Sequence, residues 1–320
     1  MTIRQYGDAT NKESDLLPGR EVVVIGVASS AGTHHAGQER APAALRAAGL
    51  VDRLRSVGIP VVDRGDVVGS TFVPDDVPST ARNLDRVVAV AAATADAVAE
   101  VLGEERLPLV LGGDCTITVG VTAGVLRHHP DAGLLYFDGD ADLATPETTG
   151  SGVLDAMGIA HLLGLADNAL GRLGPCWPLL EDKRLVLFGY DQGDPETYRE
   201  IILAARPALA RYPDVDVRAD PSGAAHRALS SLQESTGHIM VHFDVDAVDS
   251  RDLPLANFPH YGTGVPLAAA GEALGVFLGA PELVAVTLTE VNPSYEPSGH
   301  ALARYVEAVG GALATCLSDG

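Results

Sequence analysis

Short apolar runs rich in Val, Ile and Leu recur along the chain, and each is continuous rather than alternating with polar residues. We expect buried strands at 20–27, 59–63, 107–111, 133–137, 184–189, 238–243 and 283–289. Segments with helical periodicity separate these runs. They predict helices at 41–48, 83–104, 118–128, 155–165, 197–205, 224–235, 267–279 and 299–317. Apolar strands that alternate with helices are typical of a parallel sheet covered on both faces. The pattern therefore predicts an α/β fold with three layers, α/β/α, around a mostly parallel central sheet.

Length and composition favour one large domain. The chain has 320 residues, of which 46% are hydrophobic, enough to bury a sizeable core. Residues 1–18 are polar and predict an N-terminal tail, and we expect 19–320 to form a single domain. Apolar runs stay well short of the roughly 18 residues that a membrane span needs, and the first residues carry no apolar signal-peptide core. Three cysteines do not suggest a disulfide framework, so we expect a cytoplasmic protein.

The charge balance narrows the possible partners. The formal net charge is −21, which disfavours nucleic acid and anionic membranes as partners. A metal ion or a cationic small molecule is a better partner for a negatively charged protein. The alternative is that the negative charge only keeps the protein soluble.

Carboxylates follow two of the predicted strands at alternating positions. Asp138, Asp140 and Asp142 come directly after 133–137, and in an extended chain their side chains point to the same side. A solvated turn after a strand is the alternative explanation. The pattern occurs a second time, where Asp244 and Asp246 end the run 238–243. Carboxylates so close together repel one another, so two such clusters in one domain favour a site for more than one cation.

Polar residues gather behind five of the predicted strands. They occupy 112–115, 138–142, 191–194, 244–249 and 290–292. In an open parallel sheet the carboxyl ends of the strands border the ligand-binding crevice. The sequence thus predicts one rim that collects acidic groups and a thiol.

Four motifs resemble those of a known family. They are Gly-Gly-Asp-Cys-Thr at 112–116, Asp-x-Asp-x-Asp at 138–142, Asp-x-Asp-x-x-Asp at 244–249 and Thr-Glu-Val-Asn-Pro at 289–293. Together with 37–46 and Gly65-Asp66, they make the chain similar to the ureohydrolases, the arginase/agmatinase family, from about residue 20 to 315. The resemblance implies an arginase-like fold and a site for two divalent metal ions, with manganese expected. It also implies a bridging hydroxide that attacks a guanidinium carbon and releases urea, and a homo-oligomer, a trimer or a hexamer.

The resemblance assigns metal-binding roles to four aspartates. Asp138 and Asp244 would bridge the two ions, while Asp142 and Asp246 would each complete one site. Asp142 would also hold the hydroxide. The chemistry agrees, since a guanidinium is a poor electrophile and two hard cations held by carboxylates can turn water into a nucleophile near neutral pH.

Two positions depart from the family. Cys115 and Asp140 stand where the family usually has His. If both bind, five carboxylates and one thiolate carry a charge of −6 against +4 for two divalent ions. Such an excess would weaken the ions as Lewis acids, leave one site altered or empty, or favour a cationic substrate. A thiolate also shifts one site toward zinc, iron or cobalt. The alternative for Cys115 is a buried apolar cysteine.

Two further acids have catalytic roles by resemblance. Glu290 matches the carboxylate that pairs with the guanidinium, a charge-assisted contact. Asp155 aligns with a histidine that often shuttles protons in the family. With Asp142, they are the expected catalytic residues.

The loop 142–155, which corresponds to the substrate-binding loop of arginases, keeps only some of the polar residues of the arginase pattern. Thr149 and Ser151 keep hydroxyls that arginases use on the substrate, whereas Ala144 and Val153 replace their asparagines. Asp194 matches an acid that contacts the substrate ammonium, or it caps a helix. Activity on arginine itself is therefore not expected.

Two histidines belong to the predicted rim. His260, in a Gly-rich loop, is a candidate substrate-binding or proton-carrying group, or else is exposed to solvent. His242 shares a strand face with Asp244, which favours an indirect role behind the metal ligands.

The sequence therefore predicts a metal-dependent amidinohydrolase in which metal-bound hydroxide attacks the guanidino carbon of a small cationic substrate. An arginine derivative such as hydroxyarginine, agmatine or a guanidino acid would fit. The alternative is a non-catalytic relative with a partial or lost metal site that acts as a binding or assembly subunit. A third hypothesis is hydrolysis of an amide or formimino group.

Overall fold

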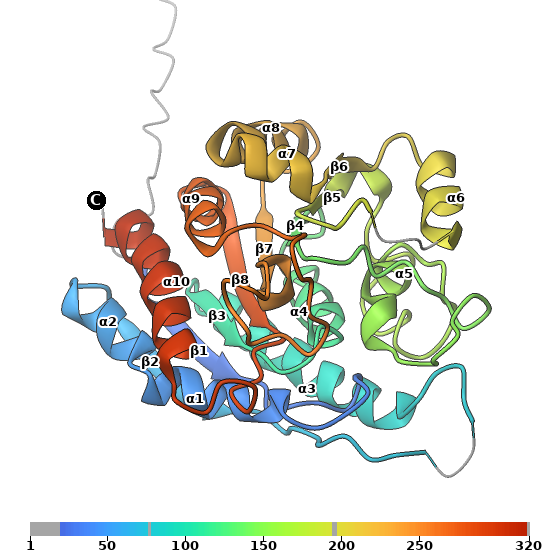
Figure 1. Cartoon of the computed structure of the whole chain (residues 1–320), viewed down its shortest axis with the longest axis horizontal. Coiled ribbons are helices and arrows are strands. Elements are labelled where there is room, and N and C mark those ends of the chain that lie inside the picture. Colours follow the sequence, from blue (N-terminus) through green and yellow to red (C-terminus); the bar gives the residue numbers. More distant parts are fainter. Residues whose placement is uncertain (1–19, 76–77, 194–196, 319–320) are drawn as a thin grey trace, which may run out of the picture.

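A single parallel sheet organises the molecule. The computed structural model describes residues 20–75, 78–193 and 197–318, so the predicted tail 1–18 lies outside the described residues (Figure 1). The strands are β1 (Val22–Gly26), β2 (Val61–Asp66), β3 (Leu107–Leu111), β4 (Gly133–Phe137), β5 (Leu185–Phe188), β6 (Ala210–Tyr212), β7 (Ile239–Asp244) and β8 (Leu283–Thr289). They pair in the order β2-β1-β3-β8-β7-β4-β5-β6, and every pair is parallel.

Helices cover both faces of this sheet (Figure 1). They are α1 (Ala41–Ala47), α2 (Leu50–Ser56), α3 (Leu84–Gly103), α4 (Ile117–Val125), α5 (Gly158–Leu162), α6 (Thr197–Ala205), α7 (Asp214–Ala219), α8 (Pro221–Gln233), α9 (Leu267–Leu278) and α10 (His300–Ser318). Buried residues of α1, α2, α8, α9 and α10 form one hydrophobic cluster with the sheet. Buried residues of α3, α4 and α5 form the other.

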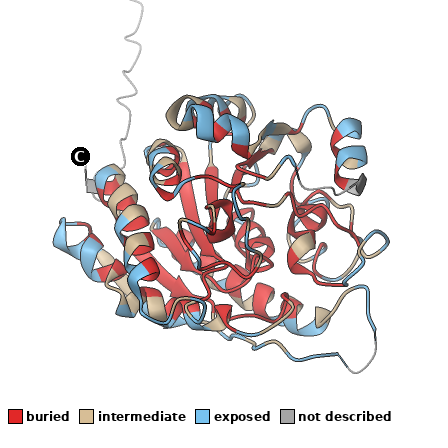
Figure 2. Ribbon diagram, viewed as in Figure 1, coloured by how far each residue is buried: buried red, intermediate tan, exposed pale blue. Residues whose placement is uncertain are grey.

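Strand alternation explains how one strand serves both layers. In β4, Leu135 and Phe137 belong to the first cluster, whereas Leu134 and Tyr136 belong to the second. All of β4 is buried, and Figure 2 shows the central strands buried throughout. This double burial is why the strands are continuous apolar runs. The predicted three-layer α/β/α fold is confirmed.

Three short elements were not expected from the sequence. They are β6, α2 and α7, of three, seven and six residues. Helix α2 carries three charged residues in seven and buries only Leu50, Val51 and Leu54. Such short pieces depend on packing against the rest of the fold, because isolated helices of this length are unstable. The predicted helix 155–165 is a 3₁₀ turn, Asp155–Met157, followed by α5.

No helix in the described parts of the chain combines the length and the apolar character needed to cross a bilayer.

The strand order decides where the functional groups meet. Strands β3, β8, β7, β4 and β5 are neighbours in the sheet, although they lie far apart in the sequence. All are parallel, so the segments that follow them emerge at the same edge. Four of the five polar segments predicted to form one rim, and 191–193 of the fifth, therefore lie side by side.

Candidate metal centre

A small cavity lies at the carboxyl ends of the central strands. Its volume is about 30 Å³. It is lined by Cys115, Asp138, Asp140, Asp142, Asp155, Ala156, Asp244, Asp246, Phe258 and Glu290. Every residue expected to bind metal is in this set, and so are all three expected catalytic residues. None of these lining residues is Lys or Arg, so nothing in the lining balances the carboxylates.

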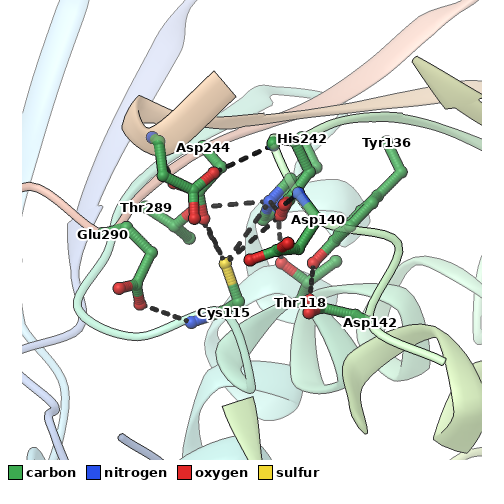
Figure 3. A network of polar contacts seen from close by, with 12 residues as sticks. Cys115, Thr118, Tyr136, Asp140, Asp142, His242, Asp244, Thr289 and Glu290 are labelled. Atoms are coloured by element: carbon green, nitrogen blue, oxygen red, sulfur yellow. Dashed lines mark hydrogen bonds and ion pairs between the residues drawn. The ribbon is translucent and has the colours of Figure 1, made fainter. Parts of the chain in front are cut away.

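The loop after β4 is folded tightly around its aspartates. The backbone N–H of Asp140 donates to Asp138 Oδ1 at 2.7 Å, and that of Gly139 donates to Asp246 Oδ1 at 2.9 Å. The hydroxyl of Tyr136 donates to Asp142 Oδ2 (Figure 3). Asp142 adopts a φ of 47°, a left-handed conformation that is unfavourable for an ordinary side chain. The fold thus holds Asp142 in a strained position that faces the cavity.

The end of β7 brings a thiol and a carboxylate together. Asp244 Oδ1 accepts from the backbone N–H of Asp246 at 2.7 Å. Its other oxygen, Oδ2, accepts from Cys115 Sγ at 2.5 Å and from Thr289 Oγ1 at 3.3 Å (Figure 3). The Cys115 Sγ atom also lies 3.7 Å from Asp138 Oδ2. Cys115 is buried, as the alternative interpretation supposed, but its surroundings are carboxylates and not an apolar core.

One backbone amide anchors the two acids on the other side of the cavity. The N–H of Cys115 donates to Asp155 Oδ1 at 2.7 Å and to Glu290 Oε1 at 3.2 Å. Gln38 Nε2 donates to Glu290 Oε2 at 2.7 Å, which links the segment 37–46 to the site. Glu290 has a φ of 63°, a second strained residue. Asp155 Oδ2 is buried and has no hydrogen-bond partner.

Burial and mutual repulsion shift the protonation of these groups. The pKa values of Asp142, Asp244 and Asp246 are raised well above the usual range, first because burial penalises the charged form and then because Asp138 is close. Burial likewise raises the pKa values of Glu290 and Asp155, with further repulsion between Glu290 and Asp155 and between Asp155 and Asp114.

The Cys115 thiol behaves in the same way. Burial raises its pKa well above the usual range, and the charges of Asp244 and Asp138 add to that shift. Without a bound cation, the site therefore favours neutral acids and a thiol. A cation would offset the repulsion and bind the ionised forms.

Two histidines stand closer to the cavity than the sequence indicated. His242 Nε2 lies 3.5 Å from Asp138 Oδ2 and 3.6 Å from Cys115 Sγ. Burial lowers the pKa of His242, which favours the neutral ring that binds metals. The ring of His260 lies between Asp140 and Asp191. Burial alone would lower its pKa, but these carboxylates outweigh it and raise the pKa to about 9.

The polar residues predicted to bind substrate in the loop 142–155 do not reach the cavity, unlike the predicted metal ligands and catalytic residues. The Thr149 and Ser151 hydroxyls bond to each other and to backbone N–H groups within the loop, and Ser151 is exposed. Neither lines the cavity. Ala144 and Val153 are buried. Asp194 lies outside the described residues.

The donor atoms fit metal ions in type and spacing. Donor atoms of Cys115, Asp138, His242 and Asp244 all lie within 4.8 Å of one another, and so do those of Asp140, Asp246 and His260. An ion that binds its ligands at about 2.0–2.4 Å can span donors separated by up to about 4.8 Å. The unpartnered Asp155 Oδ2 and the missing balance of charge point to the same conclusion.

Comparisons with known proteins agree with the fold and identify the family. The model of the Arginase family matches residues 20–313. An arginase of Bacillus caldovelox is 29% identical over 279 residues, covering 86% of this chain and 91% of the relative. The crystal structure of an arginase from Bacillus cereus matches with a TM-score of 0.82 at 27% identity, covering 92% of this chain and 98% of that one.

A proclavaminate amidino hydrolase from Streptomyces clavuligerus has a TM-score of 0.68 over 94% of this chain and 92% of its own. At 20% identity this likeness concerns the fold alone. The family match, in contrast, extends over nearly the whole described chain and includes all the strand-end motifs. The chain therefore belongs to the arginase family, the ureohydrolases.

Proposed function

We propose that this protein hydrolyses the guanidino carbon of a small cationic substrate and releases urea or a urea derivative. The observation that carries the proposal is the cavity at the ends of β3, β8, β7 and β4, where buried carboxyl groups with raised pKa values surround one space. Keeping such groups together without a partner of opposite charge destabilises the fold. The site is suited to cations, both metal ions and a cationic substrate.

The aspartates are arranged to hold two cations. Asp138 Oδ2 and Asp244 Oδ2 lie 3.7 and 2.5 Å from Cys115 Sγ, and donor atoms of the two aspartates lie within 4.8 Å of each other, so both would be able to hold the same pair of ions. Asp142 and Asp246 would complete the two sites. Two bound divalent ions, with manganese as the expected metal, would lower the pKa of a water enough to make it a nucleophile near neutral pH. Tyr136 holds the Asp142 carboxylate, which would orient that water.

Glu290 and Asp155 are placed for the substrate side of the reaction. Gln38 and the Cys115 amide hold the two oxygens of Glu290, so its carboxylate is fixed before a guanidinium arrives. Asp155 has a raised pKa and one oxygen without a partner, so it can carry a proton. We propose that it hands this proton to the departing nitrogen.

The substrate is proposed to differ from arginine either in its tail, as agmatine and guanidino acids do, or in an added hydroxyl group, as hydroxyarginine does. Apolar Ala144 and Val153 are buried and offer no amides to an α-amino or α-carboxylate group. We propose hydroxyarginine, agmatine or a guanidino acid as substrate types, with Thr149, Ser151 and Asp194 binding the tail. The family likeness also supports a cytoplasmic homo-oligomer, a trimer or a hexamer.

The direct test combines metal analysis with a substrate screen. We expect about two metal ions per chain by elemental mass spectrometry, and urea release from at least one of the proposed guanidino compounds. Protein that holds no metal after incubation with manganese would contradict the proposal. It would favour the non-catalytic alternative, a binding or assembly subunit.

Substituting Glu290→Gln is expected to weaken the use of a cationic substrate while metal content stays unchanged. A hydrogen bond to a charged group contributes about 1.5–3 kcal/mol, so kcat/KM should fall by roughly 10- to 150-fold. Glu282→Gln is the matched control, because Glu282 precedes β8 at the opposite end of the same strand. Equal kinetics for Glu290→Gln and the unchanged protein would show that Glu290 does not bind the guanidinium.

A further inference from the structure

Both positions at which the chain departs from the family have a histidine beside them. His242 Nε2 lies 3.6 Å from the sulfur of Cys115, and His260 Nε2 lies 3.6 Å from Asp140 Oδ2. His242 comes from β7, and His260 from the loop between β7 and α9. Neither histidine occupies the sequence position that carries a ligand in the family.

The ring of His242 is fixed with one nitrogen directed at the cluster. Its Nδ1 bonds to Thr118 Oγ1 at 2.7 Å, and its ring stacks on Tyr136 with centroids 4.2 Å apart (Figure 3). The side chain is fully buried. Its Nε2 faces Cys115 Sγ, Asp138 Oδ2 and the Thr289 hydroxyl, at 3.6, 3.5 and 3.3 Å. A histidine that binds a metal usually has its second nitrogen held in this way.

His260 reaches the second cluster because its loop folds back onto the end of β7. The N–H of Ser250 donates to the His260 carbonyl at 2.8 Å, and that of Gly262 donates to Asp249 Oδ1 at 3.0 Å. The His260 Nε2 atom is buried and has no hydrogen-bond partner. Its Nδ1 lies 3.6 Å from Asp191 Oδ2, which orients the ring.

Gly139 makes this approach sterically possible. A Cβ atom at this position would stand 2.7 Å from the Asp246 carbonyl oxygen, 2.8 Å from His260 Cδ2 and 2.9 Å from His260 Nε2. Such distances are too short for real side chains. Any residue other than glycine would therefore displace the His260 ring, the Asp246 backbone or both.

We propose that His242 and His260 are metal ligands that supply imidazole nitrogens in place of those absent at Cys115 and Asp140. One site then adds His242 to Cys115, Asp142 and the bridging Asp138 and Asp244. The other adds His260 to Asp140, Asp246 and the same two bridging aspartates. The inference rests on the proposed function for the presence of two metals, and it adds that the two sites are chemically unlike. Thiolate and imidazole donors favour zinc, whereas a carboxylate-rich site suits manganese.

The positions of the metals test the proposal directly. Protein stripped with a chelator is given zinc and manganese together and crystallised, and anomalous scattering is measured at both absorption edges. We expect zinc bonded to Cys115 Sγ and His242 Nε2, and manganese bonded to His260 Nε2, each Zn–N bond being about 2.0–2.1 Å. Metals that bond to neither imidazole, or an equal mixture of both metals at each position, would overturn the proposal.

Single variants give an independent measurement. His242→Gln should lose the zinc and keep the manganese, and His260→Gln should do the reverse, each counted by elemental mass spectrometry. His161→Gln is the matched control, because His161 is equally buried but bonds to Met157 and Asn168 away from the cluster. A variant that keeps both metals with only about a 10- to 100-fold loss of affinity would indicate an indirect role and overturn the assignment.

Gly139→Ala removes no donor but places a Cβ atom against both the His260 ring and the Asp246 carbonyl oxygen. We expect it to weaken manganese binding at least as much as His260→Gln does, because it displaces two residues of the same proposed site. Unchanged manganese binding in Gly139→Ala would count against the proposal.

These measurements separate the inference from the proposed function. If the unchanged protein releases urea while neither imidazole binds a metal, the inference fails and the hydrolase remains. If both imidazoles bind and no guanidino compound is hydrolysed, the ligand assignment holds and the proposed reaction fails.

Discussion

Asp244→Asn is expected to yield a folded protein that neither retains metal nor releases urea. Mutating a residue that only hydrogen-bonds to a metal ligand lowers metal affinity by up to roughly 100-fold. Asp244→Asn should lower it further, because Asp244 is proposed to bind both ions directly. Metal content, urea release and the thermal midpoint, measured on the same preparation, check this outcome.

The contacts of Asp244 explain why the fold should survive. Asparagine has the same shape, and its Oδ1 can still accept from the N–H of Asp246, which Asp244 Oδ1 accepts at 2.7 Å. The substitution removes the negative charge and turns Oδ2, the acceptor for Cys115 and Thr289, into an amide donor. The Thr289 hydroxyl and the Cys115 sulfur can both accept from that amide, so the group keeps partners. Burial first, and the charge of Asp138 next, raise the pKa of Asp244, so its ionised form destabilises the metal-free fold. The metal-free variant should therefore unfold at the same temperature as the unchanged metal-free protein or above it.

Asp131→Asn provides the matched control. Asp131 precedes β4 at the opposite edge of the sheet, where its carboxylate pairs with His238 at 2.9 Å on the surface. This variant should keep its metal and its activity. If Asp244→Asn retained two metals and normal urea release, Asp244 would not be a ligand and the proposed centre would be wrong. A scaffold protein would show no urea release in any of the three forms.

Much of the fold is predictable because the strands are buried on both faces. Their apolar runs stand out in the sequence, and the carboxylates that follow them mark the functional edge. Short elements such as α7 and β6 have no comparable signal, since they exist through contacts with their neighbours. The same holds for strained backbone, because nothing in the sequence announces that Asp142 and Glu290 adopt positive φ values of 47° and 63°.

The two histidines show where sequence reasoning reaches its limit. Strand alternation placed His242 on the same face as Asp244, but it could not show that Thr118 and Tyr136 turn the ring toward Cys115. His260 stands 14 positions after Asp246, and only the folded loop brings the two together. The available signal was Gly139, a glycine between two aspartates, whose missing Cβ leaves room for the ring.

Metal removal is expected to destabilise the protein strongly at pH 8 and only weakly at pH 5. An ion that binds the folded chain alone at 100 times its Kd stabilises it by about 2.7 kcal/mol, so two ions would contribute about 5 kcal/mol. For a chain of this size that corresponds to a thermal midpoint on the order of 10 °C higher. Thermal unfolding of metal-loaded and chelator-treated protein between pH 5 and pH 8 measures the difference.

The carboxyl groups of the site explain why metal removal destabilises the protein more at pH 8 than at pH 5. Their pKa values are raised in the metal-free fold, as shown for Asp142, Asp244, Asp246 and Glu290. Groups of this kind stabilise the fold most below their unfolded pKa of about 4, and that contribution is lost as pH rises through the folded value. His260 acts in the same direction. Its pKa of about 9 in the fold means that its contribution is present below about 6.5 and disappears toward pH 9.

At high pH, bound cations offset the loss of stability that comes from ionised carboxylates and from deprotonated His260. At low pH, protons compete with the cations for the same groups. Ion pairs away from the site, such as Arg46 with Asp63, do not affect this comparison. Burial raises the pKa of the Asp63 carboxyl, the Arg46 guanidinium lowers it and the net shift is downward, but this pair is the same in the metal-loaded and the metal-free protein. The gap between the two thermal midpoints should therefore widen steadily from pH 5 to pH 8, and Asp244→Asn should abolish it. A gap that is constant with pH, or that narrows toward pH 8, would mean that the cluster titrates without binding metal, and the proposed centre would have to be abandoned.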